Sequence, residues 1–465
     1  NFILLDRQQD LGGTWYVNHY PGLTVDVPTT TYSYFFEPNP NWSRLYSTGS
    51  EIKQYADEVA DKYDIRRHIR FNAAVDGARW DGEAGLWRVA LAGGETLAAR
   101  YLITATGFLS QPHTPEIAGV HDFEGTVIHT ADWDDSFDPT GRRIGIIGTG
   151  ATAVQLIPEM ARQAADLTVY QRTPIWVVPK VDIVFPTWAK RLFARVPITQ
   201  RAIRIITDAI YEFFIFVGLH HRQRLFHLLN LGAAGIAKLF RDVMIRDPQL
   251  RAELTPDYDL GCKRPTFSNR YYRAFTKPTV HLQTGGIERI ESDAIVSADG
   301  TRTEIDTLIL ATGFDLWEAN FPAIEIIGRD GRDLGKWWRE NRFQAYQGVS
   351  IPYFPNYLSL ASPYAFLGLN FFNTVEYQMR HMDRLFNEVK RRDADTFEIS
   401  EAANTEFLDA MTEKLATSVF NAGNCAASRS YYFNPHGEAT LLRPTTTRAA
   451  IKAAEEFPLS DYLIG

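Results

Sequence analysis

Cysteine is scarce in this sequence. Only Cys262 and Cys425 occur among 465 residues, and they form no Cys-x-x-Cys pair. This spacing excludes a disulfide framework, a cysteine zinc site and a redox-active dithiol within one motif. Such cysteine usage is typical of a reducing compartment, so we expect a cytoplasmic protein.

Positive charge is in the minority as well. The chain has 48 Lys and Arg against 56 Asp and Glu, a formal net charge of -8, and it has no lysine-rich block. Nucleic acids and anionic membranes both require a concentrated positive face, so the sequence predicts neither as a partner. Small molecules are the better prediction, and nothing in the sequence indicates the oligomeric state.

Long hydrophobic runs are absent too. The longest, Ile210 to Leu219, contains Glu212 and is shorter than the roughly 20 residues that a membrane-spanning helix needs. We expect it to form a buried or partner-facing helix, and we expect no transmembrane segment. The first residues also lack the pattern of a secretory signal.

What is present is ample apolar material, 45% hydrophobic against 22% charged residues, which suffices for one or two globular cores. The clearest local pattern is a strand from Ile144 to Ile147, a turn Gly148-Thr149-Gly150, a helix, and a strand from Leu167 to Tyr170. This order predicts a βαβ nucleotide-binding unit. Gly148 would make the tight turn, Gly150 would let a pyrophosphate approach the helix start, and Ala153 would let helix and strand pack closely.

The second strand of this unit ends in Gln171-Arg172-Thr173. That position lies about 20 residues after the glycines, where a dinucleotide ribose is read. Arg172 in place of an acid favours NADPH over NADH, because a guanidinium binds the 2'-phosphate with two donors. An ordinary surface arginine after a strand is the alternative.

Two strand ends are nearly identical: Tyr101 to Phe108 and Thr307 to Phe314 both close with Ala-Thr-Gly-Phe. The glycine would let the backbone come close to a ligand or to a neighbouring domain. The repetition predicts two related dinucleotide domains, and the alternative is two similar buried strands.

The N-terminal segment resembles the second half of another such unit. A strand from Phe2 to Leu5 is followed by Asp6, placed to accept from ribose hydroxyls, and then by Leu11-Gly-Gly-Thr-Trp-Tyr16. We therefore expect the first strand, its glycine-rich turn and the following helix to lie upstream of Asn1. For Asp6 the alternative is a simple surface acid.

One longer motif carries a family resemblance. Phe123-Glu-Gly125-Thr-Val-Ile-His129-Thr-Ala-Asp-Trp133-Asp134 has the form F-x-G-x-x-x-H-x-x-x-W-[P/D]. In this fingerprint the chain resembles the type I Baeyer-Villiger monooxygenases, class B flavoproteins related to the flavin-containing monooxygenases. The resemblance runs through nearly the whole chain, and the Trp133-Asp134 ending favours the former group over the latter.

The resemblance implies an α/β fold with two dinucleotide-binding (Rossmann-like) domains and a helical insertion, the first FAD βαβ unit being truncated at the N-terminus. The expected division is an FAD-binding domain, first part, at 1-117; a fingerprint linker at 118-141; an NADPH-binding domain at 142-304, with the insertion at about 181-260; and the second FAD-binding part with the C-terminal region at 305-465.

The implied activity is an FAD- and NADPH-dependent insertion of one oxygen atom of O2 next to a ketone carbonyl, which gives an ester or lactone through a peroxyflavin. Oxidation of nitrogen or sulfur, and a catalytically silent nucleotide-binding fragment, are the alternatives. Which ketone is used cannot be read from the sequence.

The resemblance also implies site residues. Arg264 aligns with the active-site arginine of the family, a cation that keeps its charge in a water-poor site, and Asp26 aligns with the acid that orients it. Without the resemblance, Lys263-Arg264 before Pro265 would be a solvated turn. The implied flavin contacts are Asp6, Thr14, Trp15, Asp26, Tyr32 and Val75. The implied NADPH set is Gly148, Thr149, Gly150, Ala153, Arg172, Thr173, Lys263 and Tyr431, the last in place of a tryptophan, and Arg264 is implied as a cofactor contact as well.

Two further residues are informative. His129 is implied to couple domain movement to catalysis, and since only Asp132 and Asp134 lie near it in the chain, no metal site is expected. Phe108 stands where several family members have a glutamine near the flavin, so the expected contact there is apolar.

The insertion between Lys180 and Leu260 is rich in Phe, Ile, Leu and Arg. Inserted helices of this kind cap the substrate pocket in the family. Aromatic residues at helical spacing, such as Trp188, Phe193 and Phe213, are otherwise more typical of a plain core.

Overall fold

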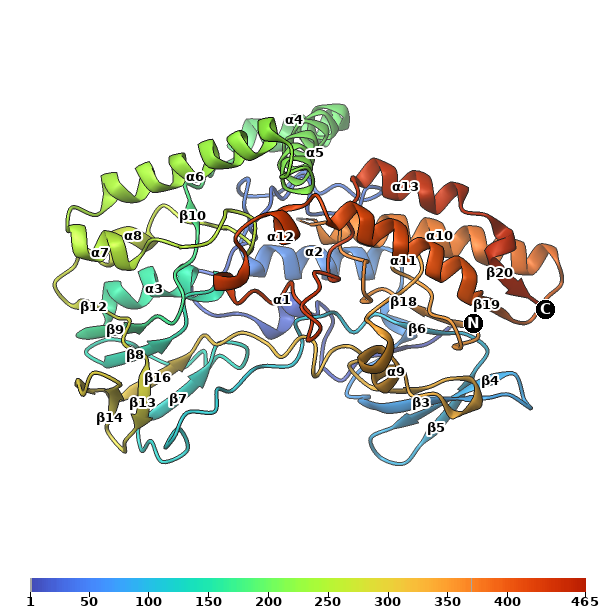
Figure 1. Cartoon of the computed structure of the whole chain (residues 1–465), viewed down its shortest axis with the longest axis horizontal. Coiled ribbons are helices and arrows are strands. Elements are labelled where there is room, and N and C mark those ends of the chain that lie inside the picture. The colour runs from blue at the N-terminus through green and yellow to red at the C-terminus, as the bar shows by residue number, and fades with distance from the viewer. Residues whose placement is uncertain (1, 369) are drawn as a thin grey trace.

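A five-stranded parallel sheet contains the predicted βαβ unit (Figure 1). The structure is a computed structural model of the chain, and it describes residues 2-368 and 370-465. The strands are β1 (Leu4–Leu5), β2 (Ile69–Arg70), β3 (Val75–Asp81), β4 (Leu86–Leu91), β5 (Thr96–Ala99), β6 (Leu102–Thr104), β7 (Thr126–His129), β8 (Arg143–Ile147), β9 (Asp166–Tyr170), β10 (Val177–Val178), β11 (Thr266–Phe267), β12 (Val280–Gln283), β13 (Ile287–Ile290), β14 (Ala294–Ser297), β15 (Arg302–Glu304), β16 (Thr307–Leu310), β17 (Glu325–Ile327), β18 (Tyr357–Ser359), β19 (Phe397–Ile399) and β20 (Tyr462–Ile464). The α-helices are α1 (Thr14–Val17), α2 (Gly49–Lys62), α3 (Ala151–Gln163), α4 (Thr187–Arg195), α5 (Pro197–Leu219), α6 (Arg224–Met244), α7 (Pro248–Glu253), α8 (Tyr271–Ala274), α9 (Leu334–Asn341), α10 (Phe371–Arg391), α11 (Glu401–Leu415), α12 (Val419–Ala422) and α13 (Thr447–Glu456).

The five strands lie in the order β12-β9-β8-β16-β7, and every neighbouring pair is parallel. All four residues of β16 are buried, as are four of the five in β8. Such continuous burial follows because layers cover both faces of a parallel sheet. The predicted βαβ unit, now β8-α3-β9, is confirmed.

The sheet includes strands from outside the expected NADPH-binding segment. β16 begins just after the expected boundary at residue 304, yet it pairs with β8 on one side and with β7 on the other. The fingerprint segment supplies β7 as the edge strand. Thr307 of β16 pairs with Thr126 of β7 and with Ile144 of β8, so the sheet joins segments that lie far apart in the chain.

A second α/β region lies on the right of Figure 1. β17, β3, β4 and β5 make a four-stranded sheet, β6 pairs with β18, and β1 pairs with β2. Both Ala-Thr-Gly-Phe closures leave the carboxyl ends of parallel strands, β6 and β16, and their glycines Gly107 and Gly313 have φ of 69° and 83°. This left-handed backbone explains the repeated glycine. The chain thus has the two Rossmann-like regions that the sequence predicts.

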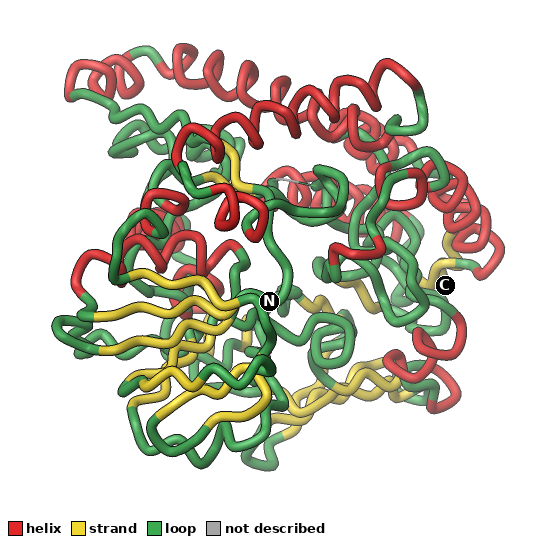
Figure 2. Tube along the Cα trace, turned by 60° about the vertical axis from the view of Figure 1, so that its left-hand side comes forward, coloured by secondary structure: helices red, strands yellow, loops and turns green. Residues whose placement is uncertain are grey.

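Helices α4 to α7 form the predicted insertion. α4, α5 and α6 lie along the upper edge of the molecule in Figure 1, and helices also line the upper edge in the turned view of Figure 2. The alternative interpretation of its aromatic residues as plain core holds for Phe193, which is buried, but is wrong for Trp188 and Phe213, which are 69% and 50% exposed. None of the helices among the described residues is long and apolar enough to cross a bilayer.

The two cysteines form a disulfide, with their Cα atoms 5.1 Å apart. Both lie in a buried cluster with Trp176, Tyr258 and Val419. The prediction that the spacing of these cysteines excludes a disulfide framework is therefore corrected. The 163 residues between them hid the pairing, because only the fold brings the two segments together.

Candidate active site

The turn after β8 is shaped for a dinucleotide phosphate. Gly148 has φ of 118°, and a Cβ there would lie 2.3 Å from the carbonyl oxygen of Ala311, so only glycine fits. Gly150 is the N-cap of α3; a Cβ on it would have open space around it, and none of the described side chains caps this helix. The first N–H groups of α3 are therefore available to an anion. Ala153 lies fully buried in the core behind them.

The end of β9 adjoins this turn. The Thr149 hydroxyl donates to the carbonyl oxygen of Thr173 at 2.9 Å, which fixes the turn to the segment after Arg172. Arg172 is exposed, whereas Lys263, from a segment 91 positions further along the chain, is half-buried. Burial and, second, the positive charge of Arg172 lower the pKa of Lys263 to about 8 from its ordinary value of 10.5. Two cations that repel each other in this way suit a shared anionic ligand.

Arg264 and Asp26 come together across the chain. The Arg264 Nε lies 3.8 Å from Asp26 Oδ2, and the two side chains are 20% and 15% exposed. The Arg264 Nη1 also donates to the carbonyl oxygen of Gly368 at 3.4 Å. Burial by itself would lower the pKa of Arg264, but Asp26, then Tyr432 and Tyr431, raise it above its ordinary value. The guanidinium therefore stays charged in a poorly solvated place.

Two residues beside Asp26 were missed by sequence reasoning. Gln155 of α3 donates through Nε2 to Asp26 Oδ1 at 3.3 Å and to the carbonyl oxygen of Thr24 at 2.9 Å. Lys180 donates to the Thr24 hydroxyl at 2.7 Å. Burial lowers the pKa of Lys180, and the negative charge of Asp26 offsets part of that decrease. The only signal for Gln155 was its place one turn beyond Ala151 in α3, and Lys180 carries no motif. Together they tie the Asp26 segment to the βαβ unit.

Two of the predicted flavin contacts, Trp15 and Tyr32, belong to one aromatic cluster. Trp15, in the short helix α1, donates through Nε1 to the Tyr32 hydroxyl at 3.3 Å. Burial raises the pKa of Tyr32 to about 12, with opposing effects from Trp15 and Arg264. Thr14 begins α1 after Gly13, whose φ of 54° again requires a flexible residue.

Asp6 and Val75 lie in a different part of this region. Asp6 Oδ1 accepts from the backbone N–H of Gln8 at 2.9 Å, and Val75, the first residue of β3, packs with Leu5 against another core cluster. Phe108, by contrast, has the apolar surroundings expected of it, with its ring 5.3 Å from that of Phe366.

Tyr431 lies near Arg264 although more than 160 positions separate them. Burial raises the pKa of Tyr431, and the charge of Arg264 lowers it. Its carbonyl oxygen accepts from Trp317 Nε1 at 2.9 Å, and its ring lies 4.9 Å from that of Tyr432. The C-terminal segment therefore closes one side of the site.

The fingerprint residues lie around β7, the edge strand of the five-stranded sheet. His129 ends β7; its Nδ1 accepts from the backbone N–H of Ala131 at 3.1 Å, and its Nε2 lies 3.5 Å from the hydroxyl of Thr312 in the second Ala-Thr-Gly-Phe segment. Burial lowers the pKa of His129, so the ring is neutral at neutral pH.

The other fingerprint residues have structural contacts. Phe123 and Trp133 are buried, Gly125 lies against the carbonyl oxygen of Asp306, and Asp134 accepts from Ser136. In the described part of the chain, no group of three or more His, Cys, Asp or Glu could hold a metal ion.

Comparisons with known proteins bear on this site. A family model described as pyridine nucleotide-disulphide oxidoreductase matches residues 26–212. A Baeyer-Villiger monooxygenase of Streptomyces coelicolor is 34% identical over 469 residues, which covers 100% of this chain and 88% of that protein. The solved structure of an oxidized steroid monooxygenase bound to NADP is 27% identical with a TM-score of 0.87, covering 99% of this chain and 94% of that one. A structure of OTEMO in complex with FAD and NADP is 25% identical with a TM-score of 0.85, covering 100% and 94%.

Proposed function

Because this chain belongs to the family of Baeyer-Villiger monooxygenases, we propose that it uses FAD and NADPH to insert one oxygen atom of O2 next to the carbonyl of a ketone. The product is an ester or a lactone. The observation that carries the proposal is the Arg264–Asp26 pair, a poorly solvated cation held between the βαβ unit and the aromatic cluster of Trp15 and Tyr32.

The residues present fit both cofactors. The open N-terminus of α3 beside Gly148 suits the pyrophosphate of NADPH, and the aromatic cluster of Trp15 and Tyr32 suits a flat ring system such as the flavin. When bound, the nicotinamide supplies the hydride and the flavin supplies the activation of O2. The protein supplies position, charge and exclusion of water.

Arg264 stabilises the negative charge that develops during oxygen transfer. Oxygen transfer to a carbonyl develops negative charge on oxygen, and a fixed guanidinium in a site of low polarity stabilises that charge without reorganisation. Asp26 is a positioning residue: it orients Arg264 and keeps the pKa of the guanidinium high. Gln155 and Lys180 hold the Asp26 segment in turn.

Arg172 and Lys263, with the hydroxyl of Thr173, bind the 2'-phosphate of NADPH. The phosphate relieves the repulsion that lowers the pKa of Lys263, so the two cations attract this cofactor over NADH.

The direct test is product analysis. The holoenzyme, supplied with NADPH and isotopically labelled O2, is given cyclohexanone, a steroid ketone and a thioether, and products are identified by mass spectrometry. We expect one labelled oxygen atom in an ester or lactone. NADPH consumption with sulfoxide as the only oxygenated product would contradict the proposal.

A further inference from the structure

The long helix α5 of the insertion buries polar side chains and exposes apolar ones, the reverse of an ordinary surface helix of a globular protein. Such a helix normally buries an apolar stripe and exposes its polar face. In α5 the most buried positions include Gln200 and Arg204, 3% and 7% exposed, whereas Ile198 and Ile205 are 71% and 68% exposed. The apolar face of α5 points to solvent.

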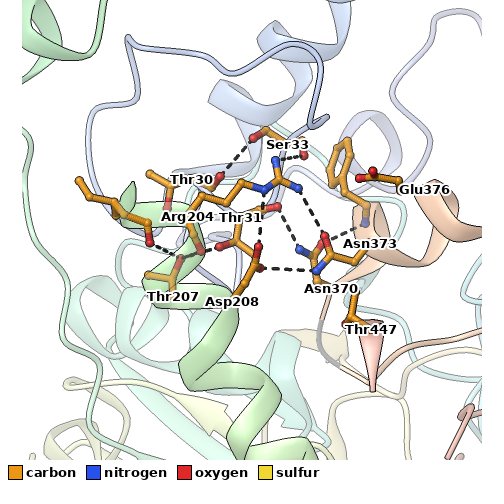
Figure 3. A network of polar contacts seen from close by, with 12 residues as sticks. Thr30, Thr31, Ser33, Arg204, Thr207, Asp208, Asn370, Asn373, Glu376 and Thr447 are labelled. Carbon is orange, nitrogen blue, oxygen red and sulfur yellow. Dashed lines mark hydrogen bonds and ion pairs between the residues drawn. The ribbon is translucent and has the colours of Figure 1, made fainter. Parts of the chain in front are cut away.

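The polar inner face makes hydrogen bonds and ion pairs with neighbouring segments, and Figure 3 shows those of Arg204 and Asp208. The Arg204 Nη1 donates to the carbonyl oxygen of Ser33 at 3.0 Å, and its Nε lies 3.6 Å from Asp208 Oδ2. The Gln200 side chain donates to the carbonyl oxygen of Asn39 at 2.6 Å, and Glu212 accepts from Thr447 at 2.6 Å. These contacts fix the rotation of α5, so the outward direction of its apolar face is built into the fold.

The neighbouring helices α4 and α6 extend this apolar surface. Of the 30 large hydrophobic side chains that are exposed among the described residues, 20 lie between Val181 and Val243. We call the exposed residues of this segment the insertion face. Its most exposed apolar members, at 50% or more, are Val181, Ile183, Val184, Trp188, Ile198, Ile205, Ile206, Ile210, Phe213, Phe214, Leu225, Leu228, Ile236, Leu239 and Val243.

The charge of this segment opposes that of the chain. Residues 181-246 contain ten Lys and Arg against four Asp and Glu, a net charge of +6, although the whole chain carries -8. From residue 183 to 246 every exposed charged side chain is basic: Arg191, Arg195, Arg201, Arg222, Arg224, Lys238 and Arg246. The acids of this stretch, Asp208, Glu212 and Asp242, are less exposed and have polar partners.

We propose that the insertion face docks the protein on the surface of an anionic phospholipid membrane. Exposed apolar side chains with Trp and Phe, flanked by basic residues, are the pattern of helices that lie in the plane of the lipid interface. Arginine and lysine near an anionic leaflet each add to the attraction. No described helix is long and apolar enough to cross the bilayer, which fits a helix lying on the surface.

Charge decides between lipid and a second copy of the chain. Asp182 is the exposed acid of the insertion face and pairs with Arg44, so two insertion faces brought together would oppose mainly basic side chains, which is unfavourable, whereas anionic headgroups complement them. The chain-wide net charge of -8 predicted that an anionic membrane is not a partner. That prediction fails for the insertion face because most of the acids lie elsewhere in the chain.

Docking would also set the candidate site close to the lipid. The Tyr211 hydroxyl, on α5, lies 3.3 Å from that of Tyr46, and Ile215 of the same helix packs against Gly368, whose carbonyl oxygen accepts from Arg264. The helix that would contact lipid on one side therefore contacts, on the other side, the Gly368 segment that binds Arg264.

The test is co-sedimentation of the purified full chain with vesicles. One set contains equal parts of phosphatidylcholine and phosphatidylglycerol, and the other contains phosphatidylcholine alone. We expect strong binding to the first set, weak binding to the second, and weakening by salt. The double variants Arg195→Glu with Arg201→Glu and Ile206→Ser with Phe214→Ser should each bind the anionic vesicles roughly tenfold or more weakly.

Matched variants on other surfaces, Arg339→Glu and Leu463→Ser, should bind like the parent. Every substituted side chain is exposed, so we expect each variant to fold. Unchanged circular dichroism and an unchanged thermal midpoint would show that it does. Failure of the parent to bind anionic vesicles, or equal binding by parent and insertion-face variants, would overturn the proposal. A dimer in analytical ultracentrifugation that the insertion-face variants convert to monomer, without vesicle binding, would assign the face to a second copy instead.

Discussion

Replacement of Arg172 by Ala tests the proposed NADPH selectivity through two linked effects. Loss of one charged hydrogen bond to the 2'-phosphate should weaken NADPH binding by about 1 to 3 kcal/mol, or roughly 5- to 150-fold. NADH lacks this phosphate, so its affinity should hardly change. The measurement is titration of the protein with each cofactor by calorimetry or fluorescence.

The second effect is on pH dependence. Lys263 has a lowered pKa of about 8 in the protein without cofactor. Its protonated fraction therefore falls from roughly nine-tenths at pH 7 to roughly one-tenth at pH 9, and NADPH affinity should fall by up to roughly tenfold over that range. Below the pKa the attraction is fully present; above it the attraction is lost. Since Arg172 is one of the two causes that lower this pKa, Arg172→Ala should move the decline to higher pH, burial still acting.

The control is Arg142→Ala, an exposed arginine just before β8, at the end of the strand away from the glycine turn. It should leave both cofactors and the pH profile unchanged. An equal loss for NADPH and NADH in Arg172→Ala, or an NADPH affinity that is flat from pH 7 to 9 in the parent protein, would refute the reasoning.

Three further expectations concern other parts of the site. Arg264→Ala should still oxidise NADPH in part but release hydrogen peroxide and form no ester, whereas Arg273→Ala should couple normally; ester formation by Arg264→Ala at the parent rate would contradict its role. Cys262→Ser should lower the free energy of unfolding by about 2 to 5 kcal/mol, since the disulfide closes a long loop. A reductant should lower the thermal midpoint of the parent but not that of the variant. Equal responses of parent and variant to the reductant would mean that the bond does not form. Gly148→Ala should destabilise the fold, on the order of 2 kcal/mol, because of its backbone strain and clash. Gly150→Ala should leave the thermal midpoint nearly unchanged yet weaken NADPH, and an equal loss of stability in both variants would contradict the different geometry of the two glycines.

Local patterns in the sequence were enough to predict the βαβ unit. The strand, the glycine turn and the helix lie within 30 consecutive residues, and the positive φ of Gly148 is a local demand that only glycine meets cheaply. The repeated Ala-Thr-Gly-Phe closures were readable for the same reason, whereas the helical insertion was implied by the family resemblance. The roles of Arg264, Asp26, Arg172 and Lys263 rested on resemblance and stay predictions.

Long-range placement was decided by the tertiary structure alone. Cys262 and Cys425 meet across 163 residues, β16 inserts between β7 and β8, and Gln155 reaches Asp26 from another region. Periodicity also cannot tell which face of an amphipathic helix is buried: in α5 the fold satisfies Arg204 and Gln200 inside and leaves isoleucines outside. Sequence fixes which residues share a face, because helix geometry is local, but only the packing of distant segments determines whether that face meets the core or the surroundings.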